Sequence, residues 1–381
     1  MAIRHRAPEF RVWTENVAGA IGDPVRRLRF LRAVATAEKQ RRRRRLVWIL
    51  VAAVAALAAA LALTRASARM PPAAAPLLAV YRPKPSLTGP RPEVWQVESR
   101  GGAEIYSNGL RIEASFAVAS HRRSYLAFPV SGSGRPVVRT EPAGIVFHST
   151  ESRQLPFEAG HNEALKRIGE SLLEYLRRRR AYHFLIDRFG RVYRVVAESD
   201  AADHAGYSVW ADDRWLYLNL NQSFLGVAFE SRTGSGPDEP PATTAQVRSA
   251  VMLTEMLRAR YGLPAGNCVT HAQVSVNPAN MGIGWHVDWA AGFPFEQLGL
   301  TGNYGIPPPA IWAFGFASDP AFRSGAAPEL QAAVDAAETL LERNAAGQGL
   351  RAAAYSKRLH QQYRERLEAV RRFAAEGRGG G

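Results

Sequence analysis

Residues 145–150 of the 381-residue chain read Ile-Val-Phe-His-Ser-Thr, and this short stretch decides the interpretation of the fold. Three apolar residues in a row predict a strand that is buried on both faces, as in the interior of an α/β sheet. His148 stands where that strand ends. Side chains at strand ends emerge into a cleft in open α/β sheets, which makes His148 the first candidate functional residue.

Helical and strand patterns alternate on either side of this strand. Apolar residues recur at helical spacing over 165–176 and again over 247–261. Further short apolar runs predict strands at 182–186, 191–196, 226–230 and 268–270, of which the first two form a hairpin. We therefore expect an α/β fold in which a mixed central β-sheet is flanked by helices.

The first 64 residues differ from the rest in charge and hydropathy. The chain has a formal charge of +15, and residues 1–45, with 13 Lys/Arg against 4 Asp/Glu, contribute +9 of it. The uncharged stretch that follows, 46–63, would span about 27 Å as a helix, close to the hydrocarbon thickness of a bilayer. The preceding arginines predict a cytoplasmic N-terminus and a plasma (inner) membrane anchor, with the domain that follows the anchor periplasmic or extracellular. A cleavable signal peptide and a buried core helix are the alternatives.

The chain is thus expected to consist of six consecutive regions. Residues 93–139 read as short strands, with Asn108-Gly109 as a hairpin turn, and two helices are expected near 328–344 and 350–375. The regions are a basic cytoplasmic tail (1–45), a transmembrane signal anchor (46–64), a Pro/Ala-rich linker (65–92), a β-rich segment (93–139), the main α/β domain (140–305) and a C-terminal helical extension with a flexible Gly-rich end (306–381).

Composition excludes several classes of protein. The single cysteine, Cys268, rules out an intrachain disulfide framework and any multi-cysteine zinc or iron–sulfur site. The basic tail carries no nucleic-acid recognition motif, so no nucleic-acid partner is expected. Its arginines are instead typical of a segment that sets the orientation of a membrane span and contacts anionic lipids.

Four polar residues suggest a metal site. His148 and His271 both follow short apolar strands, and His286 lies in a loop that also offers Asp288. Two imidazoles with a carboxylate or a third imidazole, and a water in the open position, make a catalytic zinc site. Zinc acidifies that water and polarises a carbonyl under attack. On spacing alone, the alternative is that these histidines are structural.

Five ordered motifs favour the metal site. They lie at 145–150, 182–190, 204–206, 221–227 and 270–271. In this order they resemble the zinc N-acetylmuramoyl-L-alanine amidase family (amidase type 2), which includes phage amidase lysozymes and the peptidoglycan recognition proteins. The resemblance covers about residues 140–300, and makes the main domain an amidase-like one.

The resemblance assigns ligands and a reaction. It implies that His148, His271 and Asp288 bind Zn²⁺, although His286 stays open as the third ligand. It implies a membrane-anchored hydrolase that cuts the amide between N-acetylmuramic acid and L-alanine of peptidoglycan or a muropeptide, with a zinc-activated hydroxide as nucleophile. Loss of a ligand leaves some relatives as binding modules, so a non-catalytic peptidoglycan-binding module is the alternative. A structural anchor for a cytoplasmic complex is a third possibility.

The resemblance also suggests the remaining roles. Tyr182 matches a tyrosine beside the metal, and Tyr182 and His286 would stabilise the oxyanion by hydrogen bonding. His286 or Glu230 would transfer the proton to the departing amine. Glu230 is considered because Ala228 stands where some members have a carboxylate, and Glu230 is equally compatible with a structural role. An insertion near 277–284 is expected to reshape the cleft rim.

Overall fold

The computed structural model describes residues 93–132, 134–233 and 242–378, together with Asn16, Gly19 and Gly22. The chain divides into two compact units, Met1–Ala79 and Val80–Gly381, and almost all described residues belong to the second. The expected membrane anchor, 46–64, and the linker, 65–92, lie outside the described residues, as does the basic tail apart from the three isolated positions. None of the described helices is both long enough and apolar enough to cross a bilayer.

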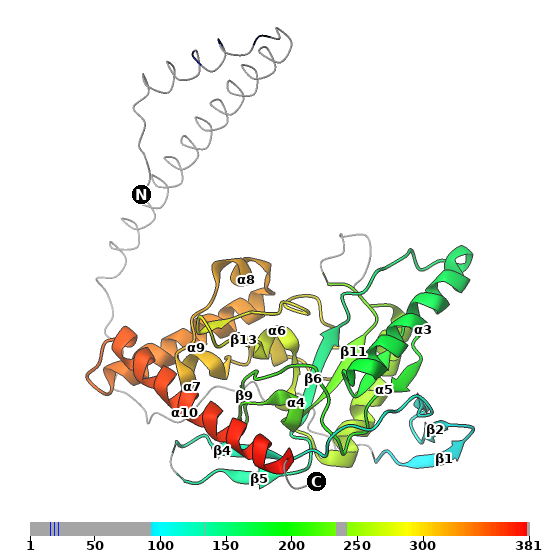
Figure 1. The fold of residues 1–381 in the computed structure, drawn as a ribbon, viewed down its shortest axis with the longest axis horizontal. Coiled ribbons are helices and arrows are strands. Elements are labelled where there is room, and N and C mark those ends of the chain that lie inside the picture. The colour runs from blue at the N-terminus through cyan, green and yellow to red at the C-terminus, as the bar shows by residue number, and fades with distance from the viewer. Residues whose placement is uncertain are drawn as a thin grey trace. The chain divides into compact units, whose positions relative to one another are not determined.

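A mixed eight-stranded sheet forms the centre of the second unit (Figure 1). Its order is β1-β2-β3-β8-β7-β11-β6-β12. The strands β6, β11, β7 and β12 pair in parallel, whereas β7–β8 and the hairpins of β1, β2 and β3 are antiparallel. The bounds are β1 (Gln96–Arg100), β2 (Ala103–Tyr106), β3 (Arg111–Glu113), β6 (Gly144–Ser149), β7 (Phe184–Ile186), β8 (Val192–Arg194), β11 (Phe224–Phe229) and β12 (Cys268–Thr270).

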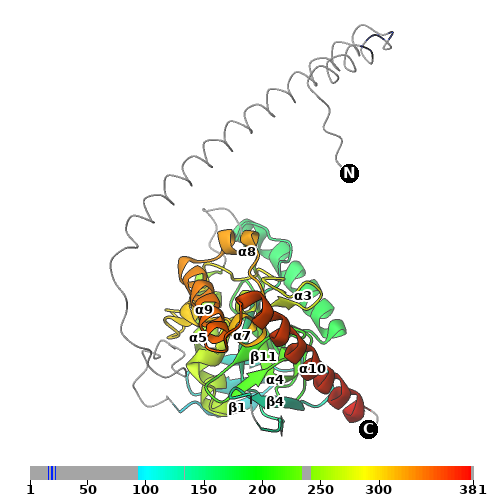
Figure 2. The ribbon, with the colours of Figure 1, turned by 90° about the vertical axis from the view of Figure 1, so that its left-hand side faces the viewer.

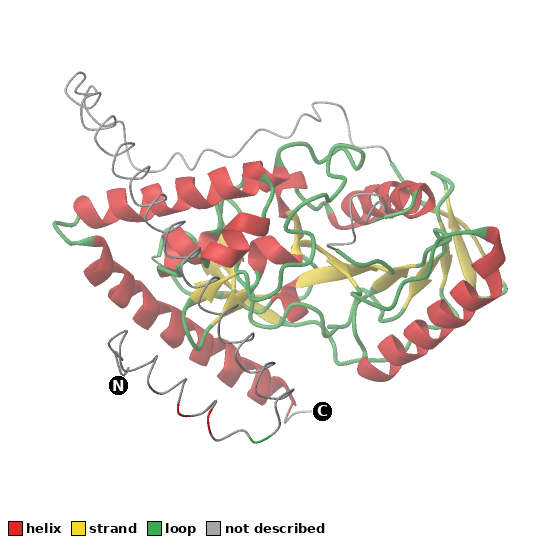
Figure 3. Cartoon of the chain, turned by 90° about the horizontal axis from the view of Figure 1, so that it is seen from above, coloured by secondary structure: helices red, strands yellow, loops and turns green. Residues whose placement is uncertain are grey.

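Helices cover both faces of this sheet, as Figure 3 shows from above. Leu173 of α3 (Asn162–Arg179) packs with Ala228 of β11, whereas Leu253 of α5 (Thr244–Tyr261) packs with Val227, the preceding residue. Successive residues of a strand point to opposite faces, so the two helices lie on opposite sides. The predicted α/β architecture with a mixed central sheet is therefore confirmed.

The remaining elements are short, except for two C-terminal helices. The smaller sheets contain β4 (Tyr125–Pro129), β5 (Val137–Arg139), β9 (Trp210–Ala211) and β10 (Trp215–Tyr217), and the pair β13 (Val276–Asn277) and β14 (Gly282–Ile283). The other helices are η1 (Ala159–His161), α4 (Leu220–Ser223), η2 (Ala265–Asn267), α6 (His271–Val274), η3 (Asn303–Gly305), α7 (Pro309–Phe314), α8 (Pro320–Gly325), α9 (Pro328–Ala346) and α10 (Ala352–Arg378). The last two confirm the helices expected near 328–344 and 350–375. Together with α7 they pack against one another (Figure 2) and share one apolar core with the central sheet.

The sequence predicts a boundary between two regions at residues 139 and 140. In the structure, strands from both sides of this boundary belong to one sheet. The predicted turn at Asn108-Gly109 is present, with Gly109 at φ 87°, and it joins β2 to β3. Strand β3 then pairs with β8 of the main domain, because its free edge would otherwise expose unpaired backbone groups. The N-terminal strands are thus an extension of the central sheet, not a separate body.

A buried arginine fixes this N-terminal segment to the main domain. Arg123 is 2% exposed, and its guanidinium donates to the backbone carbonyls of Glu198 (3.1 Å), Asp200 (3.0 Å), Gln222 (2.6 Å) and Phe224 (3.2 Å). Burial lowers the pKa of Arg123 to about 10, which still leaves the group charged at neutral pH. One side chain therefore supplies a buried donor to four carbonyls of the main domain.

Replacing Arg123 should therefore destabilise the whole unit. Arg123→Met keeps the length of the side chain but leaves four carbonyls without that donor, so we expect a loss of about 3–5 kcal/mol in the free energy of unfolding, measured in urea. Arg122→Met is the control, because the Arg122 side chain is 82% exposed and its ion pair with Asp200 spans 3.6 Å. The control should lose at most about 1 kcal/mol. If the two variants unfold at the same urea concentration, this role of Arg123 is contradicted.

Candidate metal centre

The structure brings His148, His271 and Asp288 together around one point. His148 comes from the end of β6, His271 opens α6 directly after β12, and Asp288 lies in the loop that follows β14. The ligand atoms of the three side chains all lie within 4.8 Å of one another. The Asp288 carboxylate lies 2.9 Å from Nδ1 of His271 and 3.4 Å from Nδ1 of His148. Two imidazole nitrogens and a carboxylate oxygen are a donor set that suits zinc.

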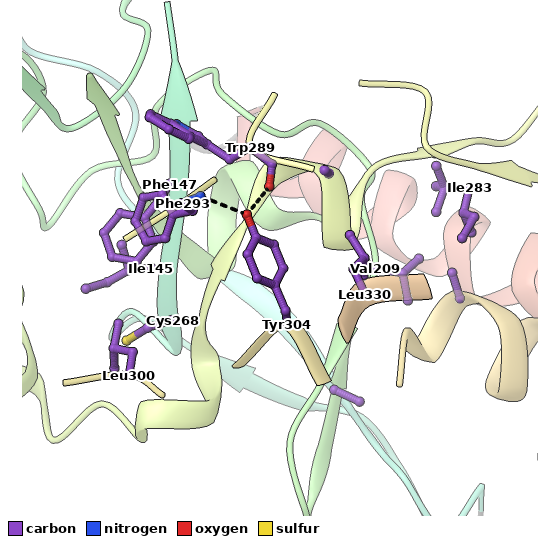
Figure 4. Close-up of a cluster of buried hydrophobic side chains, with 14 of the residues drawn as sticks. Ile145, Phe147, Val209, Cys268, Ile283, Trp289, Phe293, Leu300, Tyr304 and Leu330 are labelled. Carbon is purple, nitrogen blue, oxygen red and sulfur yellow. Dashed lines mark hydrogen bonds between the residues drawn. The ribbon is translucent and has the colours of Figure 1, made fainter. Parts of the chain in front are cut away.

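The backbone around Asp288 is held by tertiary contacts. The Asp288 carbonyl accepts a hydrogen bond from the amide of Ala272 in α6 (3.2 Å). On the other side, the Tyr304 hydroxyl donates to the Trp289 carbonyl (2.8 Å) and accepts from the Phe293 amide (3.1 Å), as Figure 4 shows. Trp289 is fully buried at φ 59°, a conformation that a bulky residue adopts only where its surroundings enforce it. These contacts fix the direction of the Asp288 side chain.

His204 determines which nitrogen of His148 carries the proton. Nε2 of His204 donates to the carbonyl of Phe224 (3.2 Å), so Nδ1 of His204 is left as an acceptor. That atom lies 3.1 Å from Nε2 of His148, which must therefore be the protonated nitrogen. The lone pair on Nδ1 of His148 is then directed towards the Asp288 carboxylate. Two electron-rich groups face each other there, an arrangement that a cation between them would stabilise.

His204 reaches this position because its surroundings are small and tightly bonded. A Cβ on Gly226 would lie 2.7 Å from Cγ of His204, so only glycine leaves room for the ring. The Asn221 side-chain oxygen accepts three successive backbone amides, those of residues 204, 205 and 206, at 2.7–2.8 Å. The segments at 204–206 and 221–227 therefore act together to support the ring of His148.

Burial and neighbouring charges set the protonation of the centre. Burial, reinforced by His271, lowers the pKa of His148 to about 4, so the ring is neutral at physiological pH. Burial would raise the pKa of Asp288, but His271 and His148 outweigh it and hold that pKa well below the ordinary value. A neutral imidazole and an ionised carboxylate are the protonation states in which these groups bind metals.

A cavity of about 450 Å³ opens beside the three residues. The centroids of the Tyr182 and His148 rings lie 4.9 Å apart. The His286 ring stacks on that of His271, with 4.6 Å between centroids and an interplanar angle of 19°. Burial and the adjacent His271 lower the pKa of His286, and burial raises that of Tyr182. The cavity is lined by Ser149, Thr150, Glu151, Tyr182, His204, Ala205, Gly206, Tyr207, Ser208, His271, Ser275, Val276, Pro278, Trp285, His286 and Asp288.

This constellation can be compared with known proteins. A family model described as N-acetylmuramoyl-L-alanine amidase matches residues 138–287. Residues 138–287 belong to that amidase family. The match confirms the family predicted from the five motifs, and with it the enzyme class of an N-acetylmuramoyl-L-alanine amidase. No curated protein matches the amidase chain.

Solved structures similar to the amidase chain share little sequence with it. The N-acetylmuramoyl-L-alanine amidase LysC from Clostridium intestinale is 21% identical, with 48% of this chain and 93% of that one covered and a TM-score of 0.26. The amidase AmiD from E. coli was solved with anhydro-N-acetylmuramic acid-L-Ala-D-gamma-Glu-L-Lys. It is 18% identical, with 64% of this chain and 98% of that one covered and a TM-score of 0.34. Drosophila peptidoglycan recognition protein SD is 20% identical, with 36% of this chain and 73% of that one covered and a TM-score of 0.25.

Glu230 lies outside the cavity of the amidase domain. Its side chain is 2% exposed, accepts the amide of Arg188 (3.2 Å) and lies against Gly169 of α3. Glu230 does not line the cavity. It follows Ala228 of β11 by two residues, and Ala228 is the residue that pairs with His148.

Sequence reasoning missed two polar residues of the amidase cavity. His204 lies in the motif at 204–206 but was not linked to His148, and Glu151 was not singled out at all. The signal for Glu151 was its position three residues after His148, where the chain leaves β6 at the edge of the cleft. Residues 276–283 form the β13–β14 hairpin, and Val276 and Pro278 of this segment line the cavity. The amide of Ile283 donates to the Ala317 carbonyl of the C-terminal region (2.9 Å).

Glu230 should give the amidase a characteristic pH dependence of stability. Burial raises the pKa of Glu230 to about 7 from 4.5, so the folded protein holds this proton at a pH where the unfolded chain has lost it. Stability should accordingly fall as the pH rises from about 4.5 to about 7, by an amount on the order of 3 kcal/mol.

Glu230→Gln removes this titration but keeps an acceptor for Arg188. The free energy of unfolding of the variant, minus that of the wild type, should therefore rise across the same pH window in urea titrations. Glu170→Gln, on the exposed face of α3, is the control and should show a constant difference. A flat difference for Glu230→Gln as well would show that Glu230 does not titrate in this range.

Proposed function

We propose that this protein is a zinc-dependent hydrolase that cuts the amide between N-acetylmuramic acid and L-alanine of peptidoglycan. The observation that carries the proposal is the convergence of His148, His271 and Asp288 at one end of the cavity, inside a domain of the amidase family. The tautomer of His148 imposed by His204 supports a cation at this point.

Each residue of the centre has a distinct role in the proposed reaction. His148, His271 and Asp288 would hold the zinc ion, which, when bound, supplies Lewis acidity to a water and to the carbonyl under attack. Tyr182 keeps its hydroxyl proton because its pKa is raised, and neutral His286 has one ring N–H. Both can donate hydrogen bonds to the oxygen of the tetrahedral intermediate. Such a donor contributes about 2.7–4 kcal/mol in a preorganised site.

The shape of the cavity suits a glycopeptide. Its volume of about 450 Å³ lies in the range of sites for small ligands. Trp285, 63% exposed, and Tyr207 provide aromatic surfaces at the lining, next to polar groups such as Ser275. A muropeptide has both a sugar ring and a polar peptide, so both kinds of surface would be used.

The proposal is tested with the purified full-length chain and insoluble peptidoglycan. Hydrolysis creates new alanine amino termini, which we expect to be released by the wild type, to stop with a chelator and to return with added zinc. Tight binding of peptidoglycan without released amino termini would instead identify the non-catalytic binding module.

Two single substitutions separate the third ligand from its neighbour. Asp288→Ala removes the carboxylate between the two imidazoles, so the purified protein should contain less than a tenth of the wild-type zinc. His286→Ala should keep its zinc and lose about 100- to 1000-fold in kcat, as expected for one oxyanion donor. Zinc is measured by atomic absorption on both proteins. The reverse pattern would make His286 the ligand.

We also propose that residues 46–64 anchor the protein in the plasma (inner) membrane as a single span, with the amidase domain outside. The support is the sequence alone: eighteen apolar residues, 46–63, directly after five arginines. In fractionated cells the full chain should sediment with membranes and resist extraction by carbonate. Protease added to spheroplasts should remove the amidase domain, and protection of the domain would contradict this orientation.

A further inference from the structure

Glu151 occupies an unusual position at the edge of the cavity. It lies two residues beyond the end of β6, the strand that carries His148, and it lines the same cavity as Tyr182 and Asp288. Its backbone adopts φ 48°, in the left-handed region that residues with a side chain rarely enter. Such a conformation is strained and persists only where neighbouring contacts enforce it.

Hydrogen bonds hold one oxygen of the Glu151 carboxylate and leave the other available. The amide of Thr233 (2.9 Å), the hydroxyl of Thr233 (2.5 Å) and the hydroxyl of Ser149 all donate to Oε1. Within 93–132, 134–233 and 242–378, no donor binds Oε2. The side chain is thus fixed through one oxygen, while the second is free to meet a substrate or a water.

The other two carboxylates considered for the site, those of Asp288 and Glu230, already contact other groups. Among the described residues that line the cavity, Asp288 is the only further carboxylate, and it lies between two imidazoles. Glu230 is buried against α3, away from the lining. Glu151 is also close enough to Tyr182 to act on it electrostatically: after burial, Asp288 and Tyr175, its charge contributes to the raised pKa of that phenol.

We propose that Glu151 is the proton carrier of the amidase reaction, a catalytic residue in addition to Tyr182 and His286. The inference rests on the proposed function, since it assigns a step of that reaction. It also accounts for the absence of a carboxylate at position 228, where the side chain is a methyl group, because Glu151 brings a carboxylate to the cavity from the neighbouring strand β6.

The proton follows a closed path in this step. Water forms a bond from its oxygen to the carbonyl carbon and gives one proton to Oε2 of Glu151. The carboxylic acid then returns that proton to the amide nitrogen as the C–N bond breaks and its electron pair passes to nitrogen. The products are the lactyl carboxylic acid of the muramic acid and the free amine of L-alanine, so one water is consumed and Glu151 is regenerated.

Glu151→Gln tests the assignment with little change in shape. The amide oxygen can still accept from Thr233, but the group cannot take up a proton. We expect kcat on a soluble muropeptide to fall by about 100-fold or more, while KM stays within threefold and zinc content and Tm stay at the wild-type values. Glu151→Asp keeps the acid on a shorter side chain and should recover part of the lost kcat.

Two controls separate catalysis from support of the loop. Glu158→Gln changes an exposed glutamate of the same loop outside the cavity lining and should leave kcat unchanged. Thr233→Val removes one donor to Oε1 but keeps the carboxylate, so kcat should fall by less than tenfold. If Thr233→Val loses as much kcat as Glu151→Gln, or if both Glu151 variants lower Tm and zinc content together, the role of Glu151 is structural.

The outcome for Glu151 is distinct from that for the proposed function. A wild type that releases alanine amino termini, with Glu151→Gln within fivefold of the Glu158→Gln control, would overturn the assignment of Glu151 and leave the amidase intact. A wild type that loads zinc, binds the muropeptide and releases no amino termini would overturn the hydrolase, and the Glu151 step with it.

Discussion

The parallel register between β6 and β12 is the constraint on which the rest of the site depends. Thr270 pairs with Phe147, so the next residue along each strand is a histidine, and the two rings lie 4.4 Å apart. Because successive residues of a strand face opposite sides, a slip of one residue would turn His148 away from His271. Buried apolar side chains on both faces of β6 specify that register, so packing of the core determines where His148 and His271 meet.

The third ligand depends on a different part of the chain. Asp288 lies one residue beyond the segment that matches the family, and its loop is held by Tyr304 and, through the β13–β14 hairpin, by Ala317. Helices α7, α9 and α10, which follow in the chain, contribute buried side chains to the same apolar core. The C-terminal extension is therefore a support for the active-site loop as well as a covering layer, which explains why it shares one apolar cluster with the central sheet.

Local patterns in the sequence predicted the helices, the main strands and the two histidines, because periodicity and strand ends are properties of neighbouring residues. They did not predict what depends on distant pairs. The joining of β3 to β8, the tautomer that His204 imposes on His148, and the exclusion of Glu230 from the cavity all follow from contacts between residues far apart in the chain. Glu151 was missed for a related reason: its fixed conformation comes from Thr233, more than eighty residues away.

The guanidinium of Arg123 has a practical consequence for anyone who would shorten this protein. The boundary suggested by family comparison, residue 138, would discard Arg123 and the strands β1–β4 that precede it. Two of the carbonyls left behind, those of Gln222 and Phe224, belong to the end of α4 and the start of β11, and the Phe224 carbonyl also accepts from His204. A shortened form that begins at residue 138 would lose the Arg123 donor to the Phe224 carbonyl, the same carbonyl that orients His204 behind His148. A shortened form that keeps this contact must begin before residue 123.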